Sequence, residues 1–137
     1  MAITHKYTLL CDDIRQENNG KFIILGLYTP DIIVPAVPFA LPSLGFFVAF
    51  EADSAGVLDF NFKLAQGDTI MSGGSGKMNV GKAGVTAVPL RLGALVFPAA
   101  GQYRFVLDVE GSGQITHEFS VALAVRNIGQ PMPPGVH

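Results

Sequence analysis

Turn-forming residues recur along this chain at intervals too short for helices, and β-branched and aromatic residues fill the segments between them. One segment is especially regular: from Leu58 to Leu64 the even-numbered positions are apolar and the odd-numbered positions are polar. Because successive side chains of a strand point to opposite faces of a sheet, this pattern predicts a half-buried strand with one face in water. Helical periodicity is nearly absent, so we expect an all-β protein.

About eight strands at this spacing, ending in a hairpin, predict a β-sandwich. The tight turn expected at Asn19-Gly20 would form a first hairpin, and the apolar run Phe22–Leu25 predicts that its second strand is buried on both faces. Pro89 predicts an edge strand or a bulge. Residues 38–43 are expected to form an extended connector and residues 72–76 a flexible loop. The clearest expected strands cover residues 6–11, 21–28, 44–51, 57–64, 85–92, 101–110 and 114–125, with shorter ones at 32–34, 69–71 and 77–80.

The length of 137 residues favours one domain, which we place at residues 1–125. Residues 126–137 hold three prolines and are expected to form an extended C-terminal tail. The segment Ile32–Phe50 carries no charge and is nearly long enough to cross a bilayer. Three prolines interrupt it, so we expect an extended segment that leads into a strand.

The pattern Pro98-x-x-Gly101-x-Tyr103-x-Phe105 resembles the approach to the penultimate strand of immunoglobulin-like and fibronectin-like domains. The resemblance covers the last third of the domain. It implies a tyrosine corner, in which the Tyr103 hydroxyl bonds back to the preceding loop. The cysteine and tryptophan pattern of antibody domains is missing, which argues against close kinship with them.

The composition predicts a protein that works by contact. Hydrophobic residues make up 49% of the chain and charged residues only 15%, so a domain of this size should leave apolar side chains on its surface. The formal net charge is −2 and the basic residues are scattered, so we expect neither nucleic acid nor a membrane as partner. The first residues lack the features of a signal peptide, and we expect cytoplasmic synthesis.

Two motifs invite a chemical interpretation. Cys11 lies in an apolar run, so we expect a buried, unreactive thiol whose pKa the neighbouring Asp12 and Asp13 would raise. Residues 73–77 read GGSGK, but Met71 occupies the position of the first glycine of a phosphate-binding loop and no helix is expected to follow. We therefore expect a flexible hairpin loop there.

The remaining polar clusters are also weak candidates. Asp12, Asp13 and Glu17 lack the spacing of a calcium loop, and we expect them to be solvated or paired with Arg15 and Lys21. The three histidines, His5, His117 and His137, lack the spacing of a zinc site. Glu118 follows His117 directly, so we expect the two side chains on opposite faces of their strand. We assign no catalytic, cofactor-binding or metal-binding residue, and we expect no enzyme.

The segment Leu9–Lys21, LLCDDIRQENNGK, followed by Leu25-Gly-Leu-Tyr28, resembles the opening of a family of small bacterial and prophage-associated proteins. The resemblance implies a β-sandwich and little more, because the family has no established activity to transfer. Our leading hypothesis is a non-enzymatic structural or interaction module that self-associates or coats a larger assembly, for example as a phage decoration protein. The alternative is a protein that binds a small ligand or a metal through residues 72–76 and Asp12-Asp13.

Overall fold

The computed structural model describes residues 1–29 and 31–124. The predicted tail at residues 126–137, and the predicted end of the last strand at Val125, lie outside these residues. None of the described residues is helical, so no helix in this part of the chain could cross a membrane. The described residues form eleven β-strands: β1 Ile3–Gln16, β2 Phe22–Tyr28, β3 Asp31–Val34, β4 Phe39–Leu41, β5 Leu44–Ala52, β6 Gly56–Gln66, β7 Thr69–Val80, β8 Gly84–Leu92, β9 Leu95–Phe97, β10 Gly101–Val109 and β11 Gly113–Leu123.

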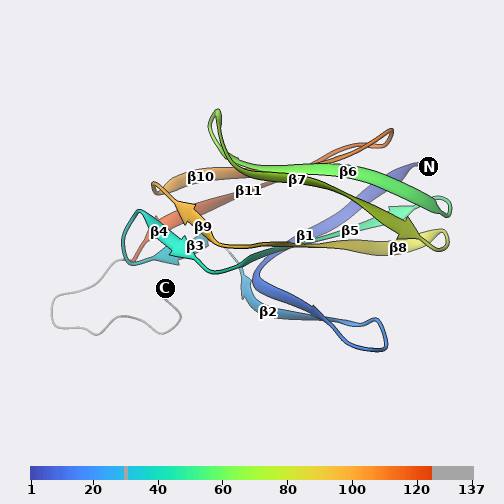
Figure 1. Cartoon of the computed structure of the whole chain (residues 1–137), viewed down its shortest axis with the longest axis horizontal. Coiled ribbons are helices and arrows are strands. Elements are labelled where there is room, and N and C mark those ends of the chain that lie inside the picture. The colour runs from blue at the N-terminus through green and yellow to red at the C-terminus, as the bar shows by residue number, and fades with distance from the viewer. Residues whose placement is uncertain (30, 125–137) are drawn as a thin grey trace.

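Two sheets pack face to face and form an immunoglobulin-like sandwich (Figure 1). The four-stranded sheet has the order β2-β1-β5-β8, and the five-stranded sheet has the order β3-β11-β10-β6-β7. Strands β6, β10 and β11 are neighbours in one sheet, while β5 pairs with β8 in the other, as in the immunoglobulin fold. Strand β3 runs parallel to β11. The predicted all-β sandwich is therefore confirmed.

The core lies between the two sheets and is built from the alternating apolar residues of the central strands. Phe46 of β5 and Phe105 of β10 stack with their ring centroids 4.0 Å apart and their planes 9° from parallel. Both rings are fully buried. On β6, Leu58 and Leu64 are buried, and the intervening phenylalanines pack against the core, which confirms the half-buried strand.

The predicted tyrosine corner is present. The Tyr103 hydroxyl donates a hydrogen bond to the carbonyl oxygen of Ala99 at 2.5 Å. The ring is buried and stacks on Phe119, with the edge of Phe97 against it. This hydrogen bond fixes the loop that leads into β10, because the loop supplies the acceptor that the buried hydroxyl needs.

Two expectations about loops were wrong. Residues 72–76 lie within β7, where each of them pairs with a residue of β6, and form no flexible loop. The glycines there lie under aromatic rings: a Cβ atom on Gly76 would lie 2.8 Å from the ring of Phe60, and one on Gly74 would lie 3.1 Å from that of Phe62. Glycine therefore allows the close approach of two side chains from β6, whose rings would have to shift to admit a larger residue. The connector at residues 38–43 contains β4, which pairs with β9 in a small separate sheet.

The β1–β2 hairpin forms a third layer on the outer face of the four-stranded sheet. The first part of β1 pairs with β5 and the second part with β2, and between them β1 bends away from the sandwich (Figure 1). Phe22 and Ile24 of β2, together with Ile14, pack on Phe47 and Ala49 of β5 in a small second core. The predicted turn at Asn19-Gly20 joins the strands of this hairpin.

Candidate interaction surface

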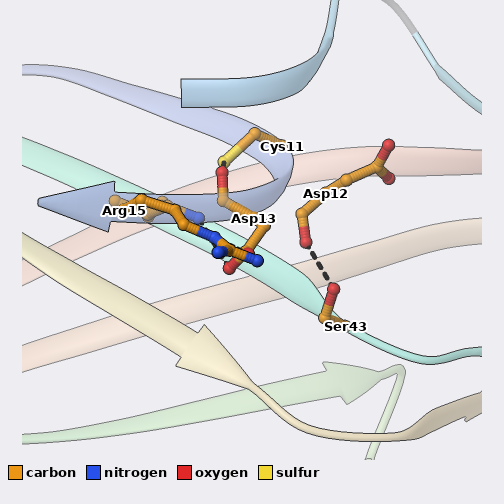
Figure 2. A network of polar contacts seen from close by, with 6 residues as sticks. Cys11, Asp12, Asp13, Arg15 and Ser43 are labelled. Atoms are coloured by element: carbon orange, nitrogen blue, oxygen red, sulfur yellow. Dashed lines mark hydrogen bonds and ion pairs between the residues drawn. The ribbon is translucent and has the colours of Figure 1, made fainter. Parts of the chain in front are cut away.

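The acidic residues of the first hairpin form ion pairs and hydrogen bonds within the hairpin. Asp13 accepts a hydrogen bond from Nε of Arg15 at 3.1 Å, and this bond is the first cause that lowers the pKa of its carboxyl group. Glu17 pairs with Lys21 at 3.3 Å across the turn. Figure 2 shows the carboxylate of Asp12 pointing away from Asp13 and Arg15. The predicted pairing is confirmed for Asp13 and Glu17, and the three carboxylates do not converge on one point.

Asp12 holds the base of the hairpin. The Tyr28 hydroxyl donates a hydrogen bond to the Asp12 carboxylate. Burial, and then this bond to a carboxylate, raise the pKa of Tyr28. The Ser43 hydroxyl donates to the backbone carbonyl oxygen of Asp12 at 2.7 Å (Figure 2). Gly26 lies against the Asp12 side chain with φ +66°, a conformation that a residue with a side chain rarely adopts. These contacts stabilise the fold of the hairpin.

Cys11 is fully buried, as predicted. Its Sγ lies 3.4 Å from the carbonyl oxygen of Asp13 and 3.6 Å from that of Gly45, so the thiol, a weak donor, has two acceptors within reach. Burial first, and the charges of Asp12 and Asp13 second, raise the pKa of the thiol to about 11. The thiolate required of a nucleophile is therefore scarce at neutral pH.

The two halves of the alternative ligand site are not brought together. Asp12 and Asp13 lie on β1 in the four-stranded sheet, whereas residues 72–76 lie on β7, the last strand of the five-stranded sheet. On β7, Lys77 pairs with Asp59 of β6 at 3.0 Å, and both residues line an open hollow. Among residues 1–29 and 31–124, no three or more His, Cys, Asp or Glu side chains are grouped so that they could hold a metal ion.

His117 lies in a row of β11 side chains that face the core, between Ile115 and Phe119. It lines a groove of about 300 Å³ between β1 and β11, opposite Thr8, whose hydroxyl is 2.9 Å from Nε2 of His5. Burial, and then the nearby His5, lower the pKa of His117. Glu118 is exposed and lines a hollow with Thr116 and Arg104, on the face of β11 opposite to Ile115 and Phe119, as predicted from strand geometry. His137 lies outside the described residues.

We expect the free energy of unfolding to fall as the pH drops below about 6.5, the ordinary pKa of an unfolded histidine. The pKa of His117 is lower in the folded chain, so in this range the unfolded chain binds more protons and is favoured by acid. Urea denaturation between pH 8 and pH 5 would measure this loss. His117→Leu should reduce it most, whereas His5→Gln removes only the second cause of the lowered pKa and should keep the part that burial produces. An unchanged pH dependence in His117→Leu would contradict the assignment.

The hairpin exposes three large apolar side chains at alternate positions of β2. Ile23, Leu25 and Leu27 are 40%, 42% and 50% exposed, and we call them the hairpin patch. The expectation that β2 is buried on both faces was therefore wrong. Phe22 and Ile24 turn toward the sheet below and Tyr28 packs against the main core, whereas the other face of β2 is left exposed in the described chain.

The hairpin patch differs from the rest of the described surface. The other large exposed apolar residues are spread over several strands and both termini of the sandwich: Met1, Tyr7, Val57, Ile70, Val85, Val96 and Leu123. A hollow on the outer face of the five-stranded sheet is lined mostly by polar and charged side chains, among them Lys63, Arg104 and Glu118. The sequence carries no local signal for the patch, because residues 22–25 are all apolar and do not show which face of the strand is covered.

Comparison with known proteins gives a family and a likeness of fold. Residues 6–122 match DUF6941, described as a family of unknown function. None of the curated proteins matches the chain. Among solved structures, the chain is similar to the CARDB domain of a protein from Pyrococcus furiosus, solved in complex with di-metal ions. The two are 12% identical with a TM-score of 0.43, over 86% of this chain and 94% of that one.

Proposed function

Because the chain belongs to DUF6941, a family of unknown function, we propose its role from its surface: a non-enzymatic interaction module that self-associates through the hairpin patch. The observation that carries the proposal is the exposure of Ile23, Leu25 and Leu27 on a strand at the edge of its sheet. Burying apolar surface yields about 25 cal/mol per Å², so three adjacent exposed side chains favour association.

The polar groups support a role without catalysis. Asp12, Asp13 and Glu17 are engaged in the contacts that hold the hairpin, and Cys11 is buried with a raised pKa. A nucleophile needs a neighbouring base and access to substrate, and these groups offer neither. With a net charge of −2 and no run of basic residues, a protein is a better partner than nucleic acid or a membrane.

The same surface would allow the chain to coat a larger assembly. A decorating protein needs a stable domain and an apolar contact surface, and this sandwich with its hairpin offers both. A phage virion is one assembly of this kind. The hairpin patch would then be shared between contacts among copies and contacts with the assembly.

The experiment that tests self-association is the molar mass in solution as a function of concentration, measured by light scattering after size exclusion. We expect the wild-type chain to form an oligomer and Leu25→Lys to weaken it on the order of 100-fold, because a lysine would bring a charge into the apolar contact. The matched control is Ile70→Lys on β7, where the native side chain is 63% exposed at the far edge of the other sheet.

The control should associate like the wild-type chain. A wild-type chain that remains monomeric at every concentration would refute self-association. An oligomer that survives Leu25→Lys, or that Ile70→Lys weakens equally, would refute the hairpin patch as its interface.

A further inference from the structure

Strand β2 differs from the other three strands that end the two main sheets in the described chain. Exposed edges are usually protected from pairing with other chains by proline, by charge or by shortness. Strand β8 carries Pro89 and Arg91, β7 carries Lys77 among its glycines, and β3 has only four residues. Strand β2 has seven residues, with neither a charge nor a proline among them. It is the edge best suited to accept another strand.

We propose that β2 pairs with β2 of a second copy of this chain, antiparallel and about a twofold axis at Leu25. The proposal rests on the proposed function and names the partner of the same surface. Leu25 is the midpoint of Phe22–Tyr28, so this register spans the strand from end to end, with Gly26, whose φ is +66°, opposite Ile24 of the second copy. It places Leu25 opposite Leu25 of the second copy and Ile23 opposite Leu27, so exposed apolar residues meet one another.

The charges near the strand favour a second copy as the occupant. In this register Lys21 lies opposite Thr29 of the second copy, so no like charges face each other across the axis. In the neighbouring strand, Arg15 and Asp13 neutralise each other at 3.1 Å beside the hairpin patch. Two copies of this neutral edge can pair without bringing like charges together, whereas a charged partner would find no opposite charge on it.

A twofold contact of this kind is closed. The same surface is used on both copies, so each dimer consumes the available β2 edges and the two β1–β2 hairpins become one continuous sheet. The dimer therefore need not extend into a fibre through this edge. The outer faces of the two sandwiches remain available for other contacts.

Disulfide trapping tests the axis. The probe is the full chain carrying Leu25→Cys, with Ile23→Cys and the wild-type chain as controls, each oxidised with oxidised glutathione and run on a non-reducing gel. Residues directly opposite each other have Cβ atoms about 5 Å apart, near the range that a disulfide spans. Two copies of Ile23→Cys would hold their thiols roughly 13 Å apart. The wild-type chain shows how much cross-linking arises from the native Cys11, which is buried.

We expect Leu25→Cys to form a covalent dimer at least about tenfold more than Ile23→Cys, and Ile23→Cys/Leu27→Cys to recover cross-linking. If the wild-type chain is an oligomer by light scattering but Leu25→Cys cross-links no better than Ile23→Cys, the axis is wrong and the proposed function stands. If the wild-type chain is a monomer, the proposed function fails, and the axis fails with it.

Discussion

Replacing Phe105 by alanine should lower the free energy of unfolding by about 3–5 kcal/mol. The ring is fully buried at the centre of the sandwich and stacks on Phe46 at 4.0 Å, with Phe62 tilted against it at 6.2 Å. Alanine would leave a cavity between two sheets that are each held by their own hydrogen bonds and cannot collapse fully to fill it. Urea denaturation followed by far-ultraviolet circular dichroism would measure the loss.

Ile70→Ala is the control for this change, because Ile70 is 63% exposed and should alter stability by less than about 0.5 kcal/mol. A domain of this size is stable by about 5–15 kcal/mol, so Phe105→Ala should remove a large fraction of the total. Equal effects of the two substitutions would mean that the sheets do not depend on the stacked rings for their packing.

The strands of the sandwich could be predicted because their local pattern and their burial agree. On β10, apolar residues alternate from Tyr103 to Val109, and the tyrosine corner confirms the resemblance that predicted it. Strand β7 could not be predicted in the same way. Gly74 and Gly76 are typical of loops in isolation, and only the rings of β6 lying over them explain why glycines occur inside a paired strand.

The presence of an apolar surface could be predicted from the sequence, but its location could not. The composition indicated exposed apolar side chains, but the run Phe22–Leu25 is compatible with a strand covered on both faces or on one. The number of covered faces is decided by the bend of β1, which carries the hairpin out of the plane of the sheet (Figure 1). That bend depends on contacts between residues distant in sequence, such as Asp12 with Tyr28, which no local pattern shows.

Gly26→Ala should destabilise the hairpin through this bend. Gly26 has φ +66°, and a Cβ atom there would overlap the Asp12 carboxylate that accepts the Tyr28 hydroxyl. We expect a loss of about 1–3 kcal/mol in the free energy of unfolding, together with faster hydrogen exchange in β2. Gly67→Ala is the matched control, because Gly67 has φ +57° with open space around it and would report the backbone strain alone.

The difference between the two substitutions isolates the contact of Gly26 with Asp12. If the Asp12–Tyr28 hydrogen bond holds the hairpin in place, Gly26→Ala should also weaken self-association, because the hairpin patch lies on the same strand; Gly67→Ala, on the β6–β7 turn, should leave the association unchanged. Equal stability losses and intact association in both variants would show that the Asp12 side chain moves aside freely. The hairpin would then be positioned by Phe22 and Ile24 against Phe47 alone.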